Sequence, residues 1–340
     1  MRHYLEKVAQ KENLSHKEMG KVMHLIMSGK ATSLEINDFL LALNDKGPTV
    51  EEITGAAQIL REFCVAVDTK REVVLDTCGT GGDKKDTFNI STVTAFVVAG
   101  AGVVVAKHGN RSVSSRCGSA DVLEALGVNI TIEAEHLSEC LDKVGLAFLF
   151  AQKLHPAMKN VAEIRKELGV KTIFNILGPL TNPARATHQI LGVYSRDLVE
   201  PMANVLKNLG LKRALVVHGA DGLDEITTTT NTFVSEFNGR DIVSYDIDPT
   251  ELGIKTASEG DLKGGDVVTN SAIAMQILKG EKGPKRDIIL LNAAYALYTA
   301  EKVKNVSDGL TLAAHAIDSG KALAKLEKLK EFTQKLQRLT

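Results

Sequence analysis

The first 67 residues repeat a pattern that is typical of short amphipathic helices. Three capping boxes, in which a serine or threonine stands three residues before a glutamate, mark helix starts at Ser15, Thr32 and Thr49. Behind each box the apolar residues recur at spacings of three and four, which places them on one face of a helix. We therefore predict a small N-terminal helical domain over residues 1–67.

From residue 72 the pattern changes to short aliphatic runs that end in glycine-rich or polar loops and are followed by longer helical stretches. This alternation is typical of a parallel sheet covered by helices. We predict an α/β fold, with a large, mostly parallel α/β domain over residues 72–340. The predicted strands are 72–75, 102–106, 146–151, 214–218 and 287–292, with threonine-rich strands near 227–236.

Composition narrows the function classes. The 340 residues include 41 basic and 42 acidic side chains, so no excess charge favours nucleic acid or a membrane surface as partner. The longest apolar run, 93–106, is shorter than the roughly 20 residues of a membrane span. The N-terminal residues carry charges within their apolar stretch, a pattern that is not typical of a signal peptide. Four cysteines without a Cys-x-x-Cys pair favour a reducing cytoplasm and give no zinc motif.

A glycine loop follows the first predicted strand. It reads Gly-Thr-Gly-Gly-Asp at residues 79–83, with Asn89, Ser91 and Thr92 before the next apolar stretch. Glycines let backbone N–H groups converge, and a helix N-terminus adds partial positive charge, so the pattern indicates a phosphate site. It lacks the Gly-Lys-Ser/Thr ending of a P-loop, and Lys84 replaces the third glycine of a dinucleotide motif. Alternatively, the glycines form only a tight turn before a helix cap.

The second predicted strand leads into a loop rich in cations, glycines and hydroxyls, from Lys107 to Ser119. Such groups can surround the oxygens of a phosphorylated ligand. Alternatively, Lys107 and Arg111 form a solvated surface and Ser119 caps a helix.

Two further features suggest ligand contacts. Arg165 shares a helical face with the apolar residues Met158, Val161 and Leu168, so its guanidinium needs an anion, either a ligand carboxylate or a buried acid of the chain. Asp224 and Glu225 stand beside a glycine turn after the strand 214–218. Neighbouring carboxylates can hold Mg²⁺ together with substrate phosphates, although adjacent acids are usually only solvated.

Taken together, these motifs resemble the signatures of the anthranilate phosphoribosyltransferases. The resemblance rests on the glycine loop with its Asn-x-Ser-Thr ending, on Lys-His-Gly-Asn-Arg-x-Val-Ser-Ser at 107–115, and on Asp-Gly-x-Asp-Glu at 221–225. It extends to about residue 300 and implies a nucleoside phosphorylase/phosphoribosyltransferase-like fold, two hinged domains and a homodimer. The implied reaction joins phosphoribosyl pyrophosphate to anthranilate with the help of Mg²⁺.

The resemblance also implies the site. Magnesium would be held by Ser91, Asp224 and Glu225, while Arg165 would receive the anthranilate carboxylate and Asn110 would touch anthranilate. No covalent nucleophile is expected, and His108 would assist by hydrogen bonding at most. The implied substrate-binding residues are Gly79, Gly82, Asp83, Thr87, Asn89, Ile90, Ser91, Thr92, Lys107, His108, Gly109, Asn110, Arg111, Ser112, Val113, Ser114, Ser115, Ser119 and Arg165.

Two other functions fit parts of the pattern. A pyrimidine nucleoside phosphorylase has a similar fold but is usually longer and differs in its phosphate loop. A non-catalytic paralogue that binds nucleic acid in a basic groove is the second alternative. The balanced charge and the complete set of substrate loops count against it.

Overall fold

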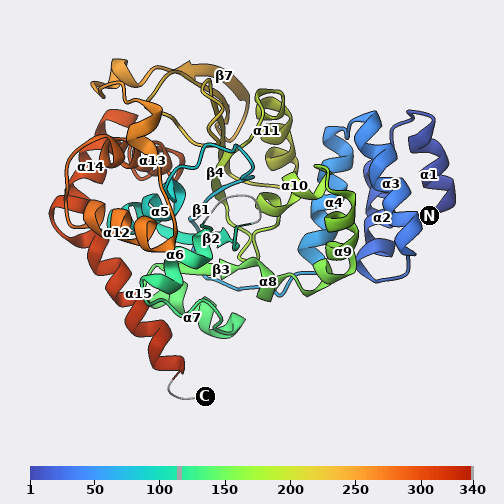
Figure 1. The fold of residues 1–340 in the computed structure, drawn as a ribbon, viewed down its shortest axis with the longest axis horizontal. Helices are drawn as coiled ribbons and strands as arrows, with labels where there is room; N and C mark the ends of the chain where they lie inside the picture. The colour runs from blue at the N-terminus through green and yellow to red at the C-terminus, as the bar shows by residue number, and fades with distance from the viewer. Residues whose placement is uncertain (113–116, 338–340) are drawn as a thin grey trace.

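The computed structural model describes residues 1–112 and 117–337. Figure 1 shows a helical bundle at the N-terminus beside a larger α/β body, with the C-terminal helix α15 (Lys321–Gln337) extending from that body. Within the described residues, no helix is both long and apolar enough to cross a membrane.

The bundle is built from four N-terminal helices and one that comes from the middle of the chain. All three predicted capping boxes are confirmed, because each hydroxyl accepts the N–H of its glutamate and each glutamate accepts the N–H of the cap residue. A later helix, α9, packs against α2 and α3, and its Val161 and Ile164 join the same apolar core (Figure 1). The five helices are α1 (Arg2–Ala9), α2 (His16–Met27), α3 (Ser33–Lys46), α4 (Val50–Glu62) and α9 (Lys159–Leu168).

The α/β body contains one seven-stranded sheet in the order β3-β2-β1-β4-β5-β6-β7. The pairings from β3 through to β5 are parallel, and the last two are antiparallel, which confirms the predicted mostly parallel α/β fold. The strands are β1 (Val74–Gly79), β2 (Val104–Gly109), β3 (Leu146–Phe150), β4 (His188–Gly192), β5 (Arg213–Gly219), β6 (Thr232–Phe237) and β7 (Ile242–Ile247).

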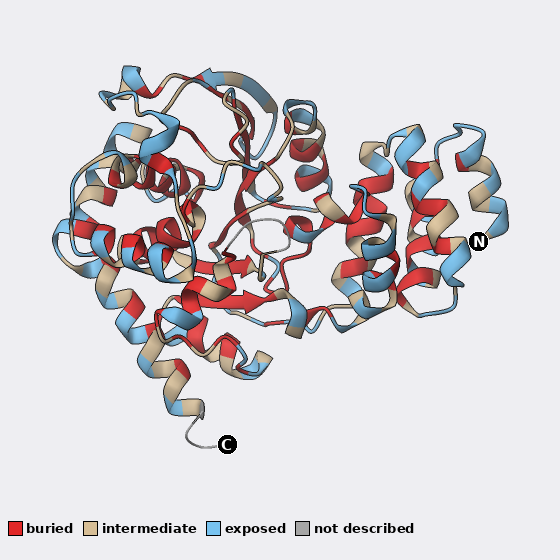
Figure 2. Ribbon diagram, in the orientation of Figure 1, coloured by how far each residue is buried: buried red, intermediate tan, exposed pale blue. Residues whose placement is uncertain are grey.

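Helices cover the sheet, and buried residues concentrate in the strands and in the helices that touch them (Figure 2). Helix α5 (Ile90–Gly100) is apolar almost all round because it packs against the sheet, α13 and α15 together. The other helices are α6 (Ser119–Ala125), α7 (Ala134–Lys143), α8 (Ala151–Leu154), α10 (Phe174–Leu177), α11 (Val199–Asn208), α12 (Val267–Leu278), α13 (Pro284–Thr299) and α14 (Val306–Asp318), with 3₁₀ turns at Pro156–Met158, Gly178–Thr181, Arg196–Leu198, Pro249–Leu252 and Glu259–Leu262.

Parts of the strand prediction are wrong. Residues 287–292 lie in helix α13, where the aliphatic run is buried on all sides and so shows no helical periodicity. Of the threonine-rich stretch, only the part from Thr232 is a strand, because the hydroxyls of Thr227 and Thr229 bond to Asp221 and hold a turn. The prediction also missed β4 and β7.

Candidate active site

The glycine loop after β1 and the acid pair after β5 meet at the carboxyl edge of the sheet. The N–H of Gly81 donates to Asp224 Oδ2 at 2.7 Å, and the N–H of Ser91, in the first turn of α5, donates to Glu225 Oε1 at 3.1 Å. Both Gly81 and Gly82 have positive φ, at 64° and 79°, a conformation that glycine adopts without strain. The structure therefore brings together two motifs that are 143 residues apart.

This contact requires glycine at two strand ends. A Cβ on Gly79 would lie 2.5 Å from Asp224 Oδ2, and a Cβ on its β-sheet neighbour Gly192 would lie 1.6 Å from the Asp224 carbonyl oxygen. Both distances are shorter than van der Waals contact allows. The absence of a side chain at Gly79 and Gly192 thus leaves room for Asp224, in addition to any role of the glycines in binding an anion.

The acid pair is electrostatically unsatisfied. Burial raises the pKa of Asp224, and the neighbouring Asp83 raises it further. Burial and the charge of Asp224 likewise raise the pKa of Glu225, although Lys107 opposes this rise. A cation between the two carboxylates would relieve the repulsion.

The metal ligands available here are few. Within residues 1–112 and 117–337, no cluster of three or more His, Cys, Asp or Glu side chains could enclose a metal ion. A divalent ion at Asp224 and Glu225 would thus take its other ligands from a hydroxyl such as that of Ser91, from water or from a phosphate. This donor set fits Mg²⁺, which prefers oxygen ligands and commonly bridges protein carboxylates to substrate phosphates.

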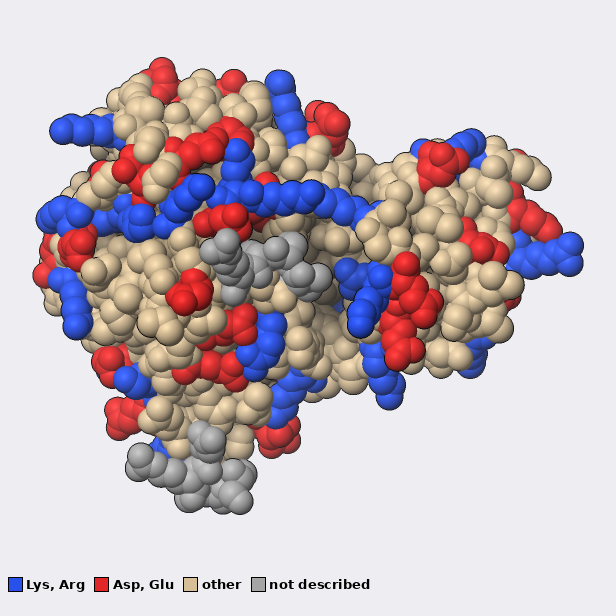
Figure 3. Space-filling view, in the orientation of Figure 1, with Lys and Arg blue, Asp and Glu red and all other residues tan. Residues whose placement is uncertain are grey.

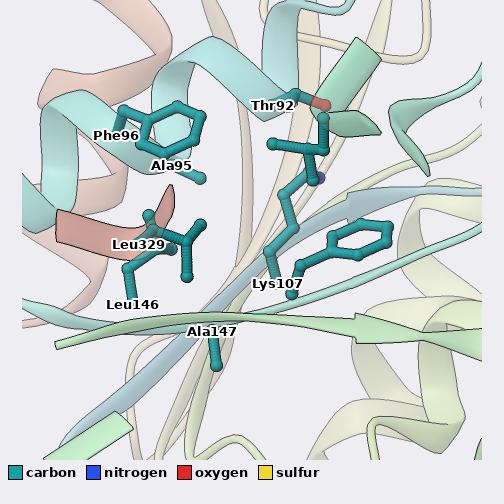
Figure 4. Close-up of a pocket in the computed structure, with 9 residues that line it drawn as sticks. Thr92, Ala95, Phe96, Lys107, Leu146, Ala147 and Leu329 are labelled. Atoms are coloured by element: carbon teal, nitrogen blue, oxygen red, sulfur yellow. The ribbon is translucent and has the colours of Figure 1, made fainter. Parts of the chain in front are cut away.

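Lys107 is buried and is not a surface residue, since its exposed fraction is 3 %. Its Nζ donates to the carbonyl oxygen of Thr77 at 2.9 Å and to Ser91 Oγ at 3.1 Å. Behind it, a cavity of about 10 Å³ between α5 and the sheet is lined by the lysine stem and Thr92 (Figure 4). That cavity is too small for a substrate. The part of Lys107 available for function is therefore its amine, which points to the start of α5.

Arg111 behaves differently from Lys107. Its guanidinium pairs with Asp121 at 2.7 Å and Glu124 at 2.5 Å, both on α6. Its charge is already balanced within the chain, so the structure ties this side chain to α6 and not to the acid pair.

Two histidines meet beside the second loop. His108 Nε2 lies 3.1 Å from His155 Nε2, and the backbone N–H of His108 donates to Asp76 Oδ1 at 3.1 Å. Burial lowers the pKa of His108 well below its usual value and lowers that of His155 to about 4. Both rings are therefore neutral at pH 7, which suits hydrogen bonding and not the delivery of a positive charge.

The remaining predicted residues lie in or beside the same two segments, the one after β1 and the one after β2. Asn89 donates to the carbonyl oxygen of Cys117 and accepts from Asn270, and Ser119 Oγ donates to the carbonyl oxygen of Asn110. Thr87 forms an isolated β-bridge to Lys263, and Ile90 is buried in α5. Gly109 packs against Ser119 and Phe148. Ser112 is described, whereas the predicted ligands Val113, Ser114 and Ser115 lie outside the described residues.

Arg165 lies on α9, on the bundle side of the molecule (Figure 1). Its guanidinium stacks over the Phe174 ring at 5.5 Å, and burial lowers its pKa. No carboxylate of the described part of the chain forms an ion pair with it, so the alternative of an internal salt bridge is wrong for those residues. Figure 3 shows that the surface is hollowed where the bundle meets the α/β body, below a band of basic side chains.

Sequence reasoning gave no role to two residues at this edge, Asp76 and Lys171. Buried Asp76 accepts hydrogen bonds from the His108 N–H and from Asn182 Nδ2, the latter at 2.7 Å, and so fixes the end of β2. Lys171 Nζ lies 3.4 Å from the carbonyl oxygen of Gly82 and 3.3 Å from the centre of the Tyr194 ring. Neither residue belongs to a local motif, and only the fold brings them to the loop.

Comparison with known proteins gives the class first. A model of the helical bundle domain of a glycosyl transferase family matches residues 2–64, and a model of the a/b domain of a glycosyl transferase family matches residues 71–323. The chain is thus a glycosyltransferase that contains both domains.

Relatives give the particular family. The anthranilate phosphoribosyltransferases of Acetivibrio thermocellus and Persephonella marina are both 53 % identical to this chain, over 97 % and 98 % of its length and 95 % and 99 % of theirs. The crystal structure of the Thermus thermophilus enzyme matches with a TM-score of 0.93 at 42 % identity, covering 97 % of this chain and 99 % of that one. The yeast enzyme in complex with PRPP and Mg matches with a TM-score of 0.91 at 28 % identity, covering 98 % and 97 %. The chain belongs to the anthranilate phosphoribosyltransferase family, as its sequence motifs suggested.

Proposed function

We propose that this chain transfers the phosphoribosyl group of phosphoribosyl pyrophosphate to the amine of anthranilate. The products are N-(5-phosphoribosyl)anthranilate and pyrophosphate, and the reaction is the second step of tryptophan biosynthesis from chorismate. The observation on which the proposal depends is the meeting of the glycine loop, Lys107 and the acid pair at one sheet edge.

The donor would lie along the two loops. The backbone N–H groups of residues 79–83 and of the N-terminus of α5 would donate hydrogen bonds to its pyrophosphate oxygens, because both present partial positive charge. Lys107 adds a full positive charge at the start of α5. The loop from His108 to Ser119 would surround the rest of the donor.

Magnesium would be held by Asp224, Glu225 and the hydroxyl of Ser91. When bound, the ion supplies positive charge that offsets the charge of the departing pyrophosphate. The yeast relative whose structure contains PRPP and Mg supports this part of the proposal. The raised pKa values of the two carboxyls support it as well, because they report a site that favours a bound cation or a proton.

Anthranilate would bind from the bundle side. Arg165 would receive its carboxylate, because the guanidinium is half-buried and no acid of the described residues neutralises it. Asn110 would contact the acceptor from the second loop. In the reaction the C1–O bond breaks and its electron pair leaves with pyrophosphate. The amine lone pair then forms the C1–N bond, and the surplus amine proton passes to water.

No enzyme nucleophile is required in this scheme. Rate enhancement would come from holding the amine and C1 in line and from stabilising the leaving group. The neutral His108–His155 pair can orient the acceptor by hydrogen bonding. A homodimer and a cytoplasmic location complete the proposal, and the four cysteines, all free thiols, agree with a reducing compartment.

The direct test mixes the purified chain with anthranilate, phosphoribosyl pyrophosphate and Mg²⁺ and follows the loss of anthranilate fluorescence. We expect the loss to require all three components and to release one pyrophosphate per anthranilate consumed. Phosphorolysis of thymidine or uridine in place of this reaction would instead establish the pyrimidine nucleoside phosphorylase alternative.

A further inference from the structure

A second cavity lies at the opposite end of the sheet from the candidate active site. Its volume is about 400 Å³, which is within the usual size of sites for small molecules. It is lined by the last turns of α4, by the segment that enters β4 and by the turn between α11 and β5, including Gln58, Arg61, Arg185, Thr187 and Gly210. It thus adjoins the junction of the helical bundle and the α/β body, where α4 packs against α11 (Figure 1).

The cavity is remote from the chemistry proposed above. Strand β4 begins directly after Thr187, which lines the cavity, and ends at Gly192, which contacts Asp224. Five residues of strand, at about 3.3 Å each, separate the two ends by roughly 17 Å. A ligand in the cavity would therefore leave the active-site loops free to bind substrates.

Two arginines face this cavity from different parts of the fold. Arg61, in the last turn of α4, is fixed by hydrogen bonds from Nε to the carbonyl oxygen of Leu180 at 2.7 Å and from a terminal nitrogen to that of Leu209 at 3.3 Å. Arg185, in the loop before β4, has φ of 49°, a left-handed conformation that is unfavourable for a residue with a side chain. One guanidinium is thus held in place, and the other is presented on a strained turn.

The two cations are not neutralised by the chain. Neither forms an ion pair with a carboxylate in residues 1–112 or 117–337, although Glu62 also lines the cavity. Burial, together with the positive charge of Arg185, lowers the pKa of Arg61 to about 10. Two arginines that repel each other beside a water-accessible cavity lower their free energy when an anion lies between them.

From this geometry we propose that the cavity binds a small oxyanion, the phosphate or carboxylate group of a metabolite, between Arg61 and Arg185. The planar guanidinium fork matches both groups, and the side chain of Gln58 adds a polar contact at the cavity wall. Because Arg61 belongs to α4 and Arg185 to the α/β body, the ligand would tie the two parts together at their junction.

The test is isothermal titration calorimetry of the full chain, with phosphoribosyl pyrophosphate and Mg²⁺ present at saturation and anthranilate absent. Under these conditions the donor part of the candidate active site is occupied, and an Arg165→Ala variant titrated in parallel identifies any heat from inorganic phosphate or succinate that comes from the open acceptor part. We expect one site per chain, and the two probes decide between phosphate and carboxylate. Loss of one charge-assisted pair of hydrogen bonds in Arg185→Gln should weaken binding about tenfold or more.

The matched control is Arg240→Gln, which removes an exposed arginine that does not line the cavity. It should change binding less than twofold. Arg185 is exposed, so its variant should fold normally, and an unchanged melting temperature without ligand checks this. The proposal is overturned if neither probe binds the wild-type chain, or if Arg240→Gln weakens binding as much as Arg185→Gln. Either result would leave the proposed transferase activity untouched.

Discussion

Carboxylates accept backbone N–H groups both in the helical bundle and in the candidate active site, but their surroundings differ. In the bundle, Glu18 accepts the N–H and hydroxyl of Ser15 and pairs with Lys7, and these bonds lower its pKa to about 2. In the candidate site, Asp224 accepts the N–H of Gly81, yet burial and Asp83 raise its pKa. The same kind of hydrogen bond thus occurs at a carboxylate whose charge is stabilised, Glu18, and at one whose charge is destabilised, Asp224.

The difference separates structural from functional carboxylates. Glu18 has its cation and its hydroxyl supplied by the chain, so it needs nothing further. Asp224 and Glu225 repel each other and Asp83, and the nearby cations Lys107 and Lys171 do not reverse the rise in their pKa values. An unsatisfied pair in a site built from glycines indicates that the missing charge comes from a ligand. The following predictions test that distinction.

The largest effect is expected for the double variant Asp224→Asn with Glu225→Gln. It keeps the shape of the acid pair and removes its charge, so turnover should fall by about 1,000-fold or more and its Mg²⁺ dependence should change. The assay is loss of anthranilate fluorescence at several Mg²⁺ concentrations. As the control, Glu18→Gln makes the same chemical change in the bundle and should leave turnover within twofold. An unaltered Mg²⁺ titration in the double variant would remove these residues from the metal site.

The next effect concerns the acceptor. Arg165→Ala should raise the KM for anthranilate by about 10- to 100-fold, since a charge-assisted pair is lost, and change the KM for phosphoribosyl pyrophosphate by less than twofold. The exposed neighbour Lys166 provides the control, and Lys166→Ala should change neither constant. Equal increases in both KM values for Arg165→Ala would contradict the assignment.

The pH dependence of stability should also reveal the unsatisfied pair. Burial and their mutual repulsion raise the folded pKa values of Asp224 and Glu225 above the unfolded values of about 4, so the native state binds more protons than the unfolded state as the pH rises from about 4 through neutral pH. Without metal, stability should therefore fall as pH rises through this window, by on the order of 1 kcal/mol after allowance for hydration. Urea unfolding in EDTA at pH 5.5 and pH 8 measures it. The double variant should lack this decrease, and an equal decrease there would assign it to other groups.

The smallest effect is expected in the bundle. Thr32→Ala removes the hydroxyl that accepts the N–H of Glu35 and should lower the free energy of unfolding by about 1 kcal/mol without changing turnover. Thermal unfolding and the fluorescence assay measure the two quantities. Ser33→Ala, one residue further on in the first turn of α3, is the control for loss of an exposed hydroxyl. A loss of turnover in Thr32→Ala would show that bundle capping is not purely structural.

Local features were predictable from the sequence. Each capping box was found because its partners stand three residues apart and depend on nothing distant. Strand β2 was also found, but it continues through Lys107 and His108 to Gly109, so the change from aliphatic to polar residues placed its end three residues too early. Helix α13 was not recognised, since a helix buried on all sides and a buried strand share one apolar pattern.

The site could be predicted only in part. The motifs carrying Gly81 and Asp224 were both recognised, but their contact depends on β1, β4 and β5 lying side by side. The hydrogen bonds that Asn182 donates to Asp76 and Lys171 donates to Gly82 likewise join segments about a hundred residues apart, at 106 and 89 residues. No pattern within one segment specifies such partners, because sheet order determines them.

The position of α9 has a consequence for how the chain folds during synthesis. Helices α1 to α4 leave the ribosome first, yet the apolar surface that receives Val161 and Ile164 stays uncovered until the segment 159–168 has been made. Nascent chains with uncovered apolar surfaces aggregate readily and are ordinary substrates for chaperones. A truncated chain that ends before residue 159 should therefore be recovered mainly in the chaperone-bound fraction, whereas one that ends after α9 can close its bundle.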